Sequence, residues 1–178
     1  MSTRLDCIYQ MIPKGGRGII DVGTDHALIP IRLAENNYQG TIFASDIADA
    51  PLALAKRTAI EHKAEKKIRF QCCDGLEQCP SDEVDTILIA GMGGDSICGI
   101  LDRTEWLFSG DYCLILQPMT QAAVVRYWLV HNGFRIDQEK LVQEGRHIYQ
   151  VFLAVMGNSE GMMDSEYLIG RRNAGQDQ

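Results

Sequence analysis

Aspartate residues close three successive apolar segments in the first half of the chain. Asp21 lies near the end of RGIIDV, Asp46 ends TIFASD, and Asp74 ends KIRFQCCD. Where such segments are parallel strands, their carboxyl ends meet at one edge of the sheet, and ligands bind there. A carboxylate after the second strand can accept hydrogen bonds from both ribose hydroxyls, and Asp74 can accept one from an adenine amino group. The three acids together predict an adenosine site, although a single strand-end aspartate is equally typical of a turn or a helix cap.

The turn after the first segment, DVGTDHA, favours one adenosine cofactor over another. Gly23 lets the backbone approach a ligand closely, but the turn lacks the G-x-G-x-x-G pattern of dinucleotide sites. Asp21 and Asp25 would repel the pyrophosphate of a dinucleotide, whereas they suit the sulfonium and ammonium groups of S-adenosylmethionine. The charges therefore favour S-adenosylmethionine as the cofactor and leave an NAD-dependent oxidoreductase as a distant alternative.

A glycine-rich segment, AGMGGDS, follows the most hydrophobic run of the chain. Its three glycines in four positions admit a flat ligand against the backbone, and Gly93 and Gly94 are predicted to begin a helix. The next apolar run ends in Gln117 and Pro118, which this topology brings to the same cleft. A flexible turn is the alternative interpretation of the glycine-rich segment.

Strand-like and helix-like segments alternate along the chain, which predicts an α/β fold with a mostly parallel sheet. A β-hairpin closes the series, with Gly145 at its turn. This ending favours the Class I methyltransferase (Rossmann-like) three-layer sandwich, whose seven-stranded sheet ends in an antiparallel hairpin. The expected helices are 2–11, 27–36, 50–62, 95–102 and 121–132, and the expected strands are 17–22, 41–46, 67–74, 84–91, 111–118, 134–142 and 147–155.

Composition limits the class of protein. The chain has 178 residues, 46% of them hydrophobic and 23% charged, which is typical of one globular domain. The sequence contains neither an apolar run of membrane-spanning length nor a signal peptide, so we expect a cytoplasmic protein. Six cysteines without metal-binding spacing are expected to be reduced thiols. The net charge of −7 argues mildly against nucleic-acid binding, but six basic residues gather between positions 56 and 69 and form either a phosphate-binding patch or a solvated helix face.

Several motifs together resemble the bacterial TrmK family: IIDVGTDHALIPIRL, CDGLE, DTILIAGMGGDSI, LILQP, RYWLVHNGFRI and HIYQVFLAV. The resemblance covers about residues 4–155. It implies a Class I enzyme that uses S-adenosylmethionine to methylate N1 of adenine 22 in tRNA. It also implies a methyltransferase domain at 1–156, followed by a tail at 157–178 in place of most of the family's helical C-terminal domain.

Site residues follow from the motifs and the resemblance together. We expect Asp25 and Asp95 to be the catalytic acids, because a carboxylate stabilises the cationic ring that N1 methylation produces. No metal, membrane segment or obligate protein partner is expected. The expected cofactor-binding residues are Asp21, Gly23, Thr24, His26, Asp46, Ile47, Asp74, Gly75, Ala90 and Gly91, and the expected substrate-binding residues are Arg4, Met92, Gly93, Gly94, Gln117 and Pro118.

Two departures from the family pattern keep other functions open. Met119 stands where the family commonly has asparagine after Gln-Pro, and only about 22 residues follow Met156. The alternatives are a methyltransferase acting on another RNA or on a small molecule, and a non-catalytic module that binds S-adenosylmethionine or RNA.

Overall fold

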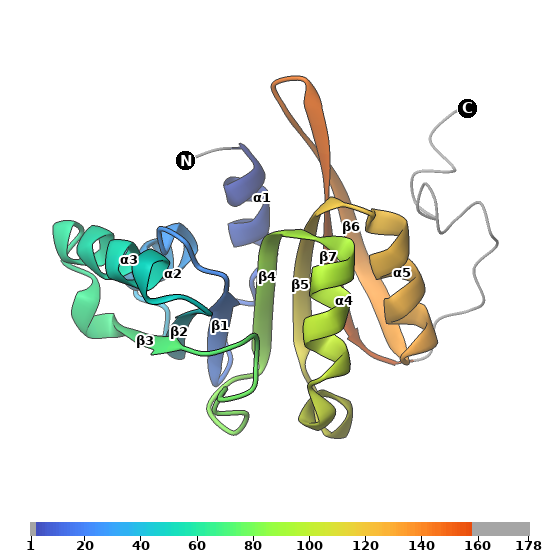
Figure 1. Ribbon diagram of the computed structural model, residues 1–178, viewed down its shortest axis with the longest axis horizontal. Helices are drawn as coiled ribbons and strands as arrows, with labels where there is room; N and C mark the ends of the chain where they lie inside the picture. The colour runs from blue at the N-terminus through green and yellow to red at the C-terminus, as the bar shows by residue number, and fades with distance from the viewer. Residues whose placement is uncertain (1–2, 158–178) are drawn as a thin grey trace.

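Seven strands form one sheet in the order β3-β2-β1-β4-β5-β7-β6 (Figure 1). The computed structural model of the protein describes residues 3–157. Five strands are parallel, and β7 runs antiparallel between β5 and β6. The strands are β1 (Gly18–Val22), β2 (Thr41–Asp46), β3 (Ile68–Cys72), β4 (Thr86–Gly93), β5 (Cys113–Thr120), β6 (Phe134–Glu144) and β7 (His147–Met156). This arrangement confirms the predicted fold class and its closing hairpin.

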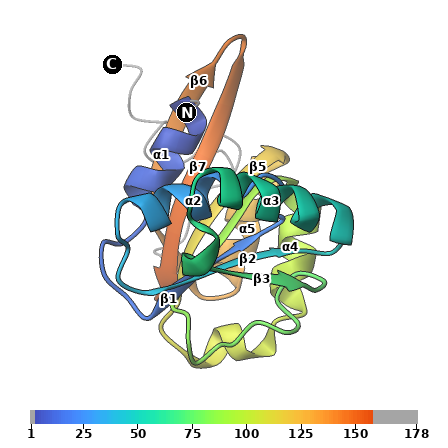
Figure 2. The same ribbon diagram turned by 90° about the vertical axis from the view of Figure 1, so that its left-hand side faces the viewer.

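Helices cover both faces of the sheet, so that its central strands are buried on both sides (Figures 1 and 2). One apolar layer packs α1, α2 and α3 against the sheet, and the other packs α4, α5 and the short helix η2. β1 is buried throughout because successive side chains enter alternate layers. The helices are α1 (Thr3–Met11), α2 (Leu28–Glu35), α3 (Asp49–Glu61), η1 (Glu65–Lys67), α4 (Gly94–Asp102), η2 (Glu105–Ser109) and α5 (Ala122–His131).

Two predicted boundaries were wrong at the carboxyl edge of the sheet. The fourth strand was expected to end at Gly91, but β4 continues to Gly93. Met92 pairs with Pro118 and Gly93 with Thr120, with register shifts on both sides of Met92. β5 likewise begins at Cys113 rather than at residue 111 and continues past Pro118. The pairing between the two extensions explains why both strands run further than expected at this edge, because each extension gives the other its hydrogen-bond partners.

The predicted tail at 157–178 lies almost wholly outside the described residues. Within 3–157, no helix is long and apolar enough to cross a membrane. The same residues contain no group of three or more His, Cys, Asp or Glu side chains that could hold a metal ion.

Candidate active site

A cavity of about 300 Å³ opens between the carboxyl ends of β1 and β4 and the helices α1 and α2. Many of the predicted site residues line it: Arg4, Asp21, Gly23, Thr24, Asp25, His26, Ala90 and Gly91. The apolar part of the lining was not predicted: it is Leu5, Leu28, Ile29 and Leu88, together with Met119, which the sequence had marked only as a departure from the family pattern. The apolar face of the first helix was the available signal for Leu5. The cavity thus combines acidic groups with an apolar wall, as small-molecule sites commonly do.

The turn after β1, which carries Asp25, has a strained backbone. Asp25 and Ala27 both have positive φ, at 47° and 54°, and Gly23 has φ 72°. A left-handed conformation costs a residue with a side chain on the order of 1 kcal/mol, and such strain gathers at functional sites. A Cβ added to Gly23 would lie 2.2 Å from the methyl carbon of Met92, the flexible end of a side chain that can move aside, so the positive φ is the main reason for glycine here. The turn leaves the side chains of Asp25 and His26 exposed beside the cavity.

Asp21 is a buried carboxyl group that has no cationic partner in the described part of the chain. Its relative exposure is 8%, and Thr24 Oγ1 donates a hydrogen bond of 2.8 Å to Asp21 Oδ2. Among residues 3–157, no Lys, Arg or His lies within ion-pair distance of it. Burial raises the pKa of Asp21 to about 7, the Thr24 hydroxyl opposes the rise, and the negative charge of Asp46 adds to it. This position suits a ligand that brings a positive charge.

The other two strand-end acids lie along the same edge but do not line the cavity. Asp46 Oδ1 accepts a hydrogen bond of 3.1 Å from the amide of Ala48. Asp74 Oδ1 accepts one of 3.0 Å from Arg103 Nη2, so an ion pair engages the acid that was predicted to face adenine. Ile47, next to Asp46, is a large exposed apolar side chain. Gly75 has φ 58°, and an added Cβ there would meet Ile100 at 2.9 Å.

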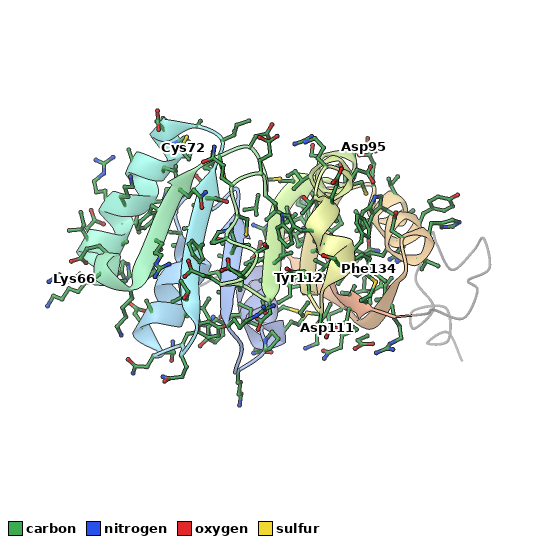
Figure 3. The ribbon with its side chains drawn as sticks, turned by 90° about the horizontal axis from the view of Figure 1, so that it is seen from below. Lys66, Cys72, Asp95, Asp111, Tyr112 and Phe134 are labelled. Carbon is green, nitrogen blue, oxygen red and sulfur yellow. The ribbon has the colours of Figure 1, made fainter. Side chains whose placement is uncertain are left out.

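The two predicted catalytic acids lie in different surroundings. Asp25 lines the cavity, whereas Asp95 does not and instead accepts a hydrogen bond from Gln121 Nε2. Figure 3 places Asp95 at the start of α4. Gln121 itself has a positive φ of 60°, and its carbonyl oxygen would lie 2.6 Å from a Cβ added to Gly94. The glycine segment therefore serves close packing at this point, rather than an open turn.

Arg4 connects the cavity to two other elements. Its Nη1 donates a hydrogen bond of 2.6 Å to Gln117 Oε1, which also accepts one of 3.2 Å from the amide of Gly91. The guanidinium lies 5.1 Å from the ring centre of Tyr149, and its Nε lies 3.8 Å from a carboxylate oxygen of Glu144. Gln117 is fully buried. Arg4 and Gln117, both predicted to bind substrate, thus bind each other and hold the backbone at Gly91.

The predicted basic cluster is partly used within the fold. Lys67 Nζ donates to the carbonyl oxygen of Ala34 and to Asn37 Oδ1, and Arg69 pairs with Glu83. Lys66, also in this cluster, lies at the opposite side of the molecule from Asp95 in Figure 3. The cluster therefore lies away from the α4 end of the candidate site.

Comparison with known proteins identifies the family. A family model described as a methyltransferase domain matches residues 1–152. The tRNA (adenine(22)-N(1))-methyltransferase of Bacillus subtilis is 32% identical over 98% of this chain and 77% of its own length. The chain belongs to the family of tRNA (adenine(22)-N(1))-methyltransferases. Among solved structures, M. capricolum TrmK in complex with S-adenosyl-homocysteine superposes with a TM-score of 0.84 at 26% identity, over 97% of this chain and 76% of that one. A Streptococcus pneumoniae protein in complex with S-adenosyl-L-methionine superposes with a TM-score of 0.88 at 29% identity, over 96% and 79%.

Proposed function

We propose that this protein is a tRNA methyltransferase that transfers a methyl group from S-adenosylmethionine to N1 of an adenine. Position 22 is expected from the named activity of the B. subtilis relative. The observation that carries the proposal is Asp21, a buried carboxyl group in the cavity that pairs with no cation among residues 3–157. A phosphate-bearing dinucleotide would increase the repulsion there, whereas a positively charged cofactor relieves it.

The residues present fit S-adenosylmethionine. We assign the neighbourhood of Asp21 and Thr24 to its ammonium group, since the buried carboxylate supplies the opposite charge. Asp46, which ends β2, is assigned to the ribose hydroxyls, with exposed Ile47 offering apolar surface to the base. Asp74 already accepts a hydrogen bond from Arg103, so its carboxylate has to accept from both Arg103 and the adenine amino group. Gly23, His26, Gly75, Ala90 and Gly91 complete the proposed cofactor site.

The cofactor supplies a methyl group on a positively charged sulfur. Neutral adenine has a lone pair on N1, so no residue has to remove a proton before attack, and correct positioning accounts for most of the acceleration. The methylated ring is a cation, which a nearby carboxylate stabilises. Asp25 lines the cavity and is the stronger candidate for this role, because Asp95 is already bound to Gln121.

The acceptor base is assigned to the edge where β4 and β5 extend together. Met92, Gly93 and Gly94 provide backbone surface there, beside Pro118 on β5. Arg4 and Gln117 are assigned a positioning role, since their mutual hydrogen bond holds Gly91 in place. Residues 1–156 form the proposed catalytic domain. A cytoplasmic location remains a proposal from the sequence.

A methyl-transfer assay tests the function. Tritium-labelled S-adenosylmethionine is incubated with unmodified bacterial tRNA and with a transcript that carries another base at position 22. We expect label on the adenine-bearing tRNA only. Equal labelling of both RNAs would show another acceptor position, a result that Met119 in the cavity wall would help to explain. Absence of label on either RNA would contradict the proposed substrate.

A further inference from the structure

The hairpin of β6 and β7 extends beyond the sheet at the edge that carries the site. β5 pairs with β7 only from Cys113↔Val155 to Leu116↔Phe152. Beyond Phe152 the two hairpin strands pair with each other alone, up to Glu144↔His147. We call residues 140–151 the arm. Figures 1 and 2 show it projecting past the carboxyl ends of the parallel strands, next to the start of α1.

One face of the arm is anchored to the catalytic domain. Val142 and Val151 are buried in the apolar layer that includes α1. Arg4 of α1 lies over the Tyr149 ring and beside Glu144, while it also donates to Gln117 at the cavity. An isolated two-stranded ribbon is only marginally stable in water. These contacts therefore hold the arm in a fixed relation to the cavity.

The opposite face of the arm carries exposed apolar side chains. Leu141 pairs with Gln150 and Gln143 with Ile148, so these four side chains share one face. Ile148 is 67% exposed and Leu141 is 48% exposed. By strand alternation they continue the face of Glu139, which binds Arg126 of α5. The exposed face thus lies on the side of the sheet that α4 and α5 cover.

The charge at the tip of the arm suits an anionic partner. Arg146 and His147 are both exposed at or beside the turn. The acid of this region, Glu144, already faces Arg4. An exposed cation beside apolar side chains is the combination with which proteins contact a nucleic-acid backbone while a wedge enters between bases.

We propose that the arm is an RNA wedge, in which Leu141 and Ile148 pack against the bases that flank the acceptor adenine and Arg146 contacts a phosphate. The inference rests on the proposed function. Turning a base out of its stack costs stacking and pairing free energy and leaves its neighbours with exposed faces. Apolar side chains that cover those faces hold the acceptor in its extruded position. Arg4 ties the opposite face of the arm to the cavity, and the wedge face projects beyond the edge of the sheet to which the acceptor base is assigned (Figure 1).

The test is the double variant Leu141→Thr/Ile148→Thr, which keeps residues suited to strands while removing apolar surface. Ile60→Thr on α3 is the matched control, since Ile60 is 60% exposed on another element. We expect the double variant to lose at least tenfold in kcat/KM for folded tRNA, with unchanged thermal stability and unchanged affinity for S-adenosylmethionine. The control should behave as wild type. Tenfold weaker binding of folded tRNA, measured by fluorescence anisotropy, should accompany the loss.

A second substrate separates a wedge from a merely structural hairpin. With a short single-stranded RNA whose acceptor adenine is already unstacked, the defect of the double variant should shrink to less than threefold. An equal defect on both substrates would overturn the wedge, as would wild-type binding of folded tRNA by the double variant. If the wild type self-associates and the double variant does not, the exposed face of the arm binds a second copy of the chain. That result would also overturn the RNA wedge. Wild-type protein that binds tRNA without methylating it would contradict the proposed function instead, because the binding comparison still tests the arm.

Discussion

Two buried carboxyl groups, Asp21 and Glu139, lie on opposite faces of the sheet and differ in their hydrogen-bond and ion-pair partners. Arg126 binds Glu139 through two nitrogens, with Nη2–Oε1 at 2.5 Å and Nε–Oε2 at 3.2 Å, and both side chains are almost fully buried. The Arg126 guanidinium also lies 5.1 Å from the ring centre of Phe152. Asp21 has only the hydroxyl of Thr24 as a side-chain hydrogen-bond donor within the described part of the chain.

This difference separates a structural charge from a binding charge. A buried carboxylate is tolerated when a cation and hydrogen bonds replace its lost hydration. Glu139 has that compensation from its own chain, in a layer remote from the cavity lining. Asp21 lacks it, its neighbour Asp46 adds repulsion, and it lines the cavity. The missing cation at Asp21 is therefore best understood as a place that a ligand fills.

Removing the cation from Glu139 should give the largest effect. Arg126→Met leaves a buried carboxylate alone, as Asp21 is, and we expect a loss of about 3–5 kcal/mol in the free energy of unfolding. Urea denaturation followed by circular dichroism measures it. The double variant Arg126→Met/Glu139→Leu is the control and should recover most of the loss, because no uncompensated charge remains. A single variant within about 1 kcal/mol of wild type would show that Glu139 does not need its partner.

Removing the charge from Asp21 should instead raise the free energy of unfolding. The folded pKa of about 7 lies above the unfolded value, so the folded state holds the proton more tightly. The free energy of unfolding of the wild type should therefore fall as pH rises from about 4 to 7, and stay low above pH 7. The stability of Asp21→Asn should not change with pH in this way. At pH 8 without cofactor we expect this variant to be about 2–3 kcal/mol more stable than wild type, because it avoids the free-energy cost of ionising Asp21 but incurs the smaller cost of burying an amide.

The same variant should bind S-adenosylmethionine at least tenfold more weakly, because the amide brings no charge to its ammonium group. Denaturation at pH 5 and at pH 8, with calorimetry at pH 8, tests both effects. Serine at Thr24 is a matched control, since it keeps the hydroxyl that donates to Asp21. A variant that is destabilised at pH 8, or that binds the cofactor normally, would remove Asp21 from its proposed role.

The sequence predicted the position of one of these two carboxyl groups but not the partner of the other. The position of Asp21 followed from the end of the apolar run RGIIDV and from the turn DVGTDHA, because local pattern decides where a strand ends. The pairing of Glu139 with Arg126 did not, since the two residues come from a strand and a helix whose packing sets the contact. The fold class and the closing hairpin were predictable for the same local reasons as Asp21.

Two predicted site residues have partners that the sequence did not show, because these contacts are made across the chain. Asp74 is bound by Arg103, 29 positions away, and Asp95 by Gln121, 26 positions away. The extension of β4 through its glycines likewise depends on the matching extension of β5. Propensity alone favours a turn at a glycine-rich segment. None of these partners leaves a periodic signal along the sequence.

Asp46 tests whether the acids around Asp21 bind the cofactor or only repel one another. We expect Asp46→Ala to weaken binding of S-adenosylmethionine by at least tenfold, consistent with about 1.5–3 kcal/mol for hydrogen bonds to a charged group. The variant should also lower the pKa of Asp21, because a neighbouring negative charge is removed. Isothermal calorimetry measures the affinity, with Asp82→Ala as the control on an exposed turn. Unchanged affinity would remove Asp46 from the ribose site.

Asp25 should show the smallest and most selective effect, because its side chain is exposed and solvent weakens its charge. Asp25→Asn keeps a residue that tolerates the positive φ of this position. We expect normal affinity for S-adenosylmethionine and a single-turnover rate that falls about threefold to tenfold, as the cationic product loses a stabilising charge. Asp95→Asn is the matched comparison: its carboxylate is bound by Gln121, so its loss should slow transfer less than that of Asp25. A normal rate for Asp25→Asn together with a slow Asp95→Asn would move the electrostatic role from the β1 turn to the start of α4.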